Sequence, residues 1–175
     1  MRIRRLSFTF VIITLLSAMG LARAQAPTSV TSEDFARSAS EHFTAQLQAA
    51  RTAQNRSKDA KVRQFASQLA SHYESAGRSL SQICEELNLD VLPQPGGAPS
   101  TAGAAAPTPR SFDRVYTLEV SQHLAKAETA FDAAIQSPKV DPKLKDFARN
   151  ELGAIREYRQ MAAPLARSEA VQGGR

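Results

Sequence analysis

The chain has 175 residues, a formal net charge of +5 and one cysteine, Cys84. A single cysteine excludes an internal disulfide, and the apolar helical stripe around Cys84 favours a buried, unreactive thiol. The sequence has no C-x-x-C pair, Gly-rich phosphate loop, H-E-x-x-H or G-x-S-x-G motif that would mark a metal, nucleotide or hydrolase site. Four arginines and no acidic residue lie in residues 1–24, so the rest of the chain carries only +1 and is not expected to bind nucleic acid.

Residues 1–24 have the three-part pattern of a secretory signal peptide. Three arginines precede an uncharged apolar run, and Ala22 and Ala24 supply the small residues of a cleavage site. The apolar run is shorter than the ~20 residues that a transmembrane helix needs. We therefore expect cleavage after Ala24 and a mature protein that is periplasmic or secreted and has no integral membrane span.

The rest of the chain is expected to be all-α. Four long segments carry an apolar repeat of about 3.6 residues, and none carries a convincing alternation. The first three expected helices cover residues 32–56, 58–89 and 111–136, and a fourth begins at Pro142.

Each expected helix has a residue suited to cap its start. The caps are Thr31 or Ser32, Ser57, Ser111 and Asp141. Pro164 should kink or end the fourth helix, because proline removes a helical hydrogen bond.

Five prolines among glycine and alanine interrupt the pattern at residues 90–110, which predicts a loop. At ~3 Å per residue this loop could run the length of a bundle, as a crossover, or form a slack hairpin. Two helical pairs joined by one long linker predict a four-helix bundle over residues 32–168. Residues 25–31 form a short lead, and residues 169–175 a disordered tail.

Polar residues interrupt all four apolar stripes at similar heights. These are Gln46, His72, His123 and Tyr158, with Glu119 one turn from His123 on the same face. Side chains that face into a bundle core are the usual ligands of metal sites in such folds. We therefore expect His72 and His123 to face each other, with Glu119 and Tyr158 within reach.

The same residues allow three interpretations. They could form a polar layer whose members satisfy one another by hydrogen bonds, as buried polar groups must. They could bind one divalent metal ion through His72, His123 and Glu119, with Gln46 and Tyr158 as neighbours. A di-metal centre fits less well, because it would need about four carboxylates and two Glu-x-x-His motifs. His42 also faces this core or its edge, where a lone histidine is usually structural.

Several short motifs together resemble a bacterial family of exported, ferritin-like four-helix domains, the domain of unknown function four-one-four-two. The resemblance covers residues 33–166 and rests on the segments 62–66, 71–76, 112–116 (similar to F-D-x-x-Y), 121–123, 141–148 and 161–162. It implies a ferritin-like bundle. Where the family has a glutamate, two aspartates and a histidine, this chain has Gln46, Ser71, Gln122 and Tyr158, which weakens the metal hypothesis.

We expect an exported, non-enzymatic helical bundle with an envelope or stress-related role. A protein of the envelope is its expected kind of partner, and no cofactor is expected other than a divalent metal ion in the polar layer. The alternatives are a metal-binding protein of the ferritin-like type and a protein-interaction module.

Overall fold

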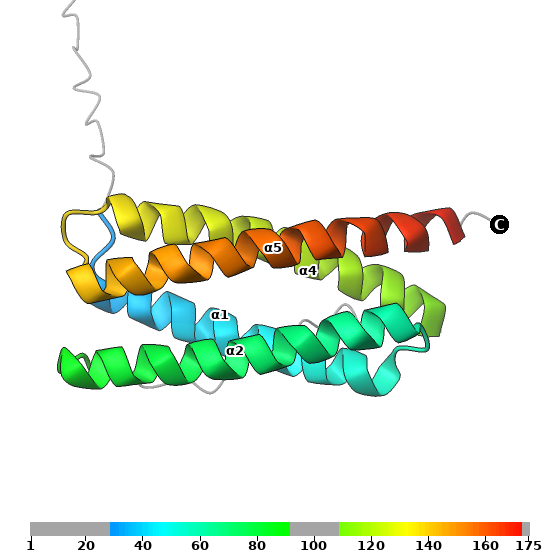
Figure 1. Ribbon diagram of the computed structural model, residues 1–175, viewed down its shortest axis with the longest axis horizontal. Helices are drawn as coiled ribbons and strands as arrows, with labels where there is room; N and C mark the ends of the chain where they lie inside the picture. The colour runs from blue at the N-terminus through cyan, green and yellow to red at the C-terminus, as the bar shows by residue number, and fades with distance from the viewer. Residues whose placement is uncertain (1–28, 92–108, 173–175) are drawn as a thin grey trace, which may run out of the picture.

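The computed structural model describes residues 29–91 and 109–172, and this part of the chain is a four-helix bundle without strands, as predicted (Figure 1). The helices are α1 (Ser32–Arg56), α2 (Ala60–Glu86), α4 (Pro109–Gln136) and α5 (Pro142–Gln172). None of these helices is both long and apolar enough to span a bilayer. The predicted signal peptide, 1–24, and most of the predicted loop lie outside the described residues.

The start of α1 is capped as the sequence predicts. The Thr31 side chain accepts a hydrogen bond from the backbone N–H of Asp34, and Asp34 reaches back to the backbone of Thr31. This reciprocal capping box satisfies two N–H groups that have no partner inside the helix. The fourth helix also begins as predicted, with the Asp141 carboxylate accepting from the backbone N–H of Lys143 at 2.8 Å.

Both ends of α2 differ from the prediction. Asp59, rather than Ser57, caps the start of the helix, because its carboxylate accepts from the backbone N–H groups of both Lys61 and Val62. Ser57 instead ends α1 in an extended conformation. At the other end Asn88 takes a left-handed conformation, with φ at 52°. A left-handed residue stops a helix, so α2 ends at Glu86 and not near residue 89.

The two helices after the loop are longer than expected. Helix α4 begins at Pro109, two residues before the expected cap Ser111, because the first turn of a helix tolerates a residue without an N–H. Helix α5 continues past Pro164 to Gln172, into the expected tail. Pro164 is exposed, and Leu165 beside it packs on the core.

Contacts at both ends of the bundle fix its topology. The guanidinium of Arg56, at the end of α1, lies 4.7 Å from the ring of Phe112, at the start of α4. At the opposite end, Lys143 of α5 pairs with Glu86 of α2 at 2.6 Å. Helices α2 and α4 therefore run in the same direction. The connection between them joins opposite ends of the bundle, which settles the choice between crossover and hairpin in favour of the crossover (Figure 1).

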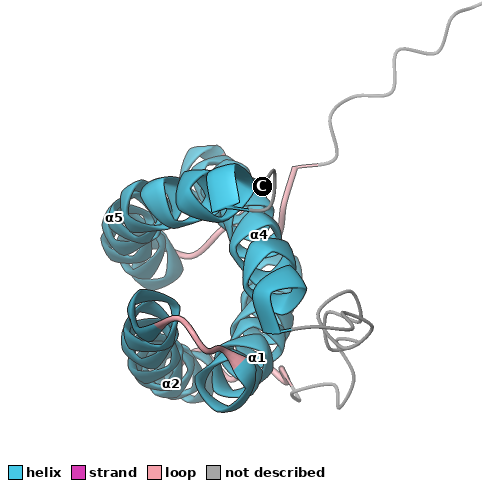
Figure 2. Cartoon of the chain, turned by 90° about the vertical axis from the view of Figure 1, so that its right-hand side faces the viewer, coloured by secondary structure: helices cyan, strands magenta, loops and turns pink. Residues whose placement is uncertain are grey.

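The helices pack as two antiparallel hairpins, α1–α2 and α4–α5. Contacts are extensive within each hairpin and sparser between them, where α1 meets α4 and α2 meets α5. Helices α2 and α4 are diagonally opposite (Figure 2). Alanines alternate with larger side chains in the core, and Cys84 is buried in it as expected. The largest fully buried side chains are Tyr73, Phe112, Phe131, Leu69, Leu124, Leu144, Ile155, Val62, Val120 and Thr117.

Candidate functional site

The interface between the two hairpins brings polar side chains from all four helices toward the middle of the core. These side chains lie on the faces of the helices that point into the core, and several of them are buried or half-buried among aromatic rings. The polar residues of this layer are His42, Gln46, His72, Tyr73, Tyr116, Glu119, His123, Glu151 and Tyr158.

Helices α2 and α5 meet through His72 and Glu151. Nε2 of His72 lies 3.0 Å from Oε2 of Glu151, and the two side chains are only 19 % and 13 % exposed. The two groups lie within ion-pair distance but form no hydrogen bond, and neither of these buried atoms has another hydrogen-bond partner in the described part of the chain. A close imidazole–carboxylate pair with both facing atoms free of hydrogen bonds can hold a proton or a cation between them.

Tyr158 supports one side of this pair. Its ring centroid lies 5.1 Å from that of His72, and its hydroxyl donates to the backbone carbonyl of Gln68 at 3.3 Å. Burial, followed by the charges of Glu157 and Glu151, raises the pKa of the phenol. Tyr158 therefore remains a neutral hydrogen-bond donor that orients the histidine ring.

The second polar contact involves α1 and its two neighbours. The Tyr73 hydroxyl lies 3.4 Å from Nε2 of His42 and can donate to it when the ring is neutral. Burial, and then the nearby His123 of α4, lower the pKa of His42 from 6.5 to about 4. His42 is therefore neutral at pH 7, which lets its nitrogen accept a hydrogen bond from the phenol.

Tyr73 stands between the two polar contacts. Its ring packs against both His42 and His72, with centroids 5.6 Å from each. Burial, followed by the charges of Tyr116, Glu151 and Tyr158, raises its pKa well above the ordinary value, so the phenol stays protonated.

The F-D-x-x-Y motif at the start of α4 supplies two further buried polar atoms. Oδ1 of Asp113 and the hydroxyl of Tyr116 are buried without a hydrogen-bond partner in the described structure. The Tyr116 ring stacks on Phe112, with centroids 6.0 Å apart, and burial raises the pKa of its phenol.

The predicted site residues all lie in or beside this layer, but they are divided between different neighbours. His72 contacts Glu151 on the adjacent α5, whereas His123, on the diagonally opposite helix, lies beside His42. Glu119 is half-buried on α4 and engaged in an interaction, and Gln46 is buried. Within residues 29–91 and 109–172, no three His, Cys, Asp or Glu side chains group closely enough to hold a metal ion.

Sequence reasoning missed the role of Glu151. The residue belongs to the apolar stripe of the fourth helix, beside Leu152, and that position could have identified it as a second inward glutamate. The i, i+4 spacing of Glu119 to His123 is visible within one helix, and it points to Glu119 instead. A contact between α2 and α5 depends on the order of helices around the bundle, which a stripe does not specify.

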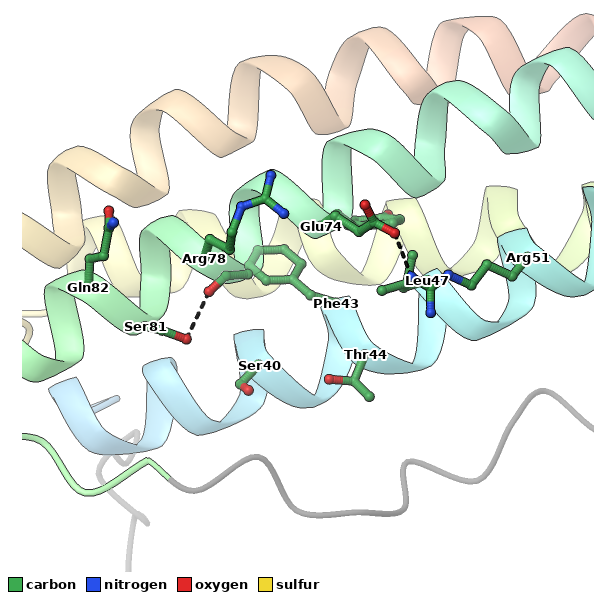
Figure 3. Close-up of a pocket in the computed structure, with 11 residues that line it drawn as sticks. Ser40, Phe43, Thr44, Leu47, Arg51, Glu74, Arg78, Ser81 and Gln82 are labelled. Carbon is green, nitrogen blue, oxygen red and sulfur yellow. Dashed lines mark hydrogen bonds and ion pairs between the residues drawn. The ribbon is translucent and has the colours of Figure 1, made fainter.

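An open groove of about 620 Å³ lies between α1 and α2 (Figure 3), and neither His72 nor Glu151 lines it. Phe43 lies between the two helices, the Arg51–Glu74 ion pair of 2.5 Å closes one end, and Ser40 and Ser81 lie toward the other. The residues that line this groove include no His, Cys or Asp, and Glu74, the one acidic side chain among them, is paired with Arg51.

The model of one protein family, described as a domain of unknown function (DUF4142), matches residues 18–165. No curated protein and no solved structure gives a significant match to the chain.

Proposed function

The chain belongs to the DUF4142 family, and from this premise we propose that it is an exported, non-enzymatic helical-bundle protein of the bacterial periplasm. One observation carries the non-enzymatic part of the proposal. The polar side chains of the core contact one another between helices, as His72 with Glu151 and Tyr73 with His42, and of these four only Tyr73 also lines the open groove. The contact of His72 with Glu151 joins the two hairpins, and that of Tyr73 with His42 joins the two helices of the first hairpin, which are structural roles.

The connectivity supports the ferritin-like part of the proposal. One long connection joins two antiparallel hairpins end to end, which is the arrangement found in ferritin-like bundles. Ferritin-like enzymes need several carboxylates close together in the core, whereas Glu151, Glu119 and Asp113 form no group of three that could hold a metal ion in the described part of the chain.

Export is supported by the pattern of residues 1–24, in which a basic start, an apolar run and Ala22-x-Ala24 follow in order. In the periplasm the near-neutral mature chain would meet envelope proteins, and a partner of that kind fits an envelope or stress-related role.

The experiment is fractionation of bacteria that produce the chain, with N-terminal sequencing of the recovered protein. We expect the protein in the periplasmic fraction with Gln25 as its first residue. The control variant carries Leu15→Arg and Leu16→Arg, which place charges in the apolar run, and it should stay inside the cell at full length. Recovery of the unmodified chain from the membrane or the cytoplasm with Met1 as its first residue would overturn the proposal.

A further inference from the structure

We propose that His72 and Glu151 bind a divalent transition-metal ion between α2 and α5. The inference goes beyond the proposed function and holds wherever the protein resides. It starts from the two facing atoms, Nε2 and Oε2, which are buried 3.0 Å apart and make no hydrogen bond. Buried polar atoms normally have such a partner, so this pair requires an explanation.

The separation of the two atoms suits a shared metal ion. Bonds of ~2.1 Å to an imidazole nitrogen and a carboxylate oxygen are usual for first-row metals. An ion at that distance from both atoms would subtend an angle of about 90° at their 3.0 Å separation. Adjacent ligands of an octahedral ion make this angle. Imidazole together with a carboxylate favours a transition metal over Mg²⁺, which prefers oxygen ligands alone.

The surrounding side chains hold the histidine ligand in place. The His72 ring packs against the rings of Tyr73 and Tyr158, with centroid distances of 5.6 Å and 5.1 Å. Tyr158 is itself tied to α2 by its hydrogen bond to the carbonyl of Gln68. A ring fixed in this way loses little freedom when it binds an ion, which lowers the cost of binding.

A cavity between α2 and α5 adjoins the carboxylate side of the pair, since Glu151 lines it and His72 does not. It has a volume of about 420 Å³, and Glu151 lines it together with Asn150, Ser79 and Ile83. The charged residues on its rim are neutralised, since Lys143 pairs with Glu86, and Asp146 pairs with Arg149. The entrance therefore neither repels nor strongly attracts a cation.

Two protein ligands make this a modest site that water must complete. No third His, Cys, Asp or Glu joins the pair within the described residues. We therefore expect reversible binding of one ion per chain, weaker than at a structural zinc site with four protein ligands.

Zn²⁺ is the probe, added to protein that has been purified without an affinity tag and treated with a chelator. Thermal unfolding and calorimetric titration are measured, with Mg²⁺ as the comparison ion. We expect one Zn²⁺ per chain and a saturable rise in Tm of roughly 3–8 °C, because an ion that binds only the folded state stabilises it. Mg²⁺ should produce neither saturable binding nor a rise in Tm.

Three variants test the assignment to this pair. His72→Gln and Glu151→Gln should each lose the Zn²⁺ response, whereas His123→Gln, on the opposite helix, should retain it. Far-UV circular dichroism establishes that each variant is helical. Two outcomes overturn the proposal: no saturable binding to the unmodified protein, which needs no variant to interpret, or an equal response in the His72→Gln, Glu151→Gln double variant.

Discussion

Acidification should destabilise the bundle through His42 before most carboxylates are protonated. Burial and the neighbouring His123 lower the pKa of His42 from 6.5 to about 4 in the folded protein. Between these pH values the unfolded chain binds a proton that the folded chain does not. The free energy of unfolding must therefore fall as the pH drops from about 6.5 to about 4, and this contribution is constant outside that window.

The size of the effect follows from the pKa change. Each pKa unit corresponds to ~1.4 kcal/mol, so a fall from 6.5 to about 4 corresponds to about 3 kcal/mol. Stabilities of single domains are ~5–15 kcal/mol, so one buried histidine could remove a large share of the total.

The assay is urea unfolding, followed by far-UV circular dichroism at pH values from 8 to 4, with His42→Gln as the matched variant. Glutamine can still accept the hydrogen bond from Tyr73 but does not titrate. We expect the unmodified protein to lose about 3 kcal/mol more than the variant over this range. Parallel pH profiles, or an NMR titration of folded His42 near its ordinary pKa, would refute the reasoning.

Two further predictions follow from the topology and the helix caps. Deleting residues 92–106 leaves only residues 87–91 and 107–108 between α2 and α4, a reach of roughly 27 Å at ~3.4 Å per residue, where a bundle of ~38 Å must be crossed. The deletion should therefore abolish the folded monomer in size-exclusion chromatography, whereas a Gly/Ser segment of equal length should preserve it; a deletion variant with an unchanged Tm would contradict the crossover. Asp59→Ala should cost about 1 kcal/mol in urea unfolding, because two N–H groups lose their acceptor, whereas Lys58→Ala next to it should cost almost nothing. Equal costs would assign the start of α2 to another cap.

The periodicity of the sequence identifies most of the fold. The bounds of α1 match the prediction because Thr31 and Asp34 form a capping box within one turn. The predicted start of α2 was wrong because Ser57 and Asp59 are both good caps, and only the backbone conformation distinguishes them. Asn88 is the clearest case of a residue whose effect depends on one dihedral angle that the sequence does not fix.

The site was less predictable than the fold. Inward-facing positions such as Gln46 and His72 can be read from an apolar stripe, since each stripe belongs to one helix. The residues that they contact on other helices cannot be read from the stripe, because the crossover places α5, rather than α4, beside α2. The contact between His72 and Glu151 follows from that order of helices.

A double-mutant cycle in chelator-containing buffer tests this central contact most directly. The free energy of unfolding is measured for His72→Gln, Glu151→Gln and the double variant, and again with Glu119→Gln in place of Glu151→Gln. We predict a coupling of about 1 kcal/mol or more between His72 and Glu151, because their facing atoms are 3.0 Å apart in the core. The coupling between His72 and Glu119 should be below about 0.5 kcal/mol. A coupling to Glu119 as large as that to Glu151 would contradict the account.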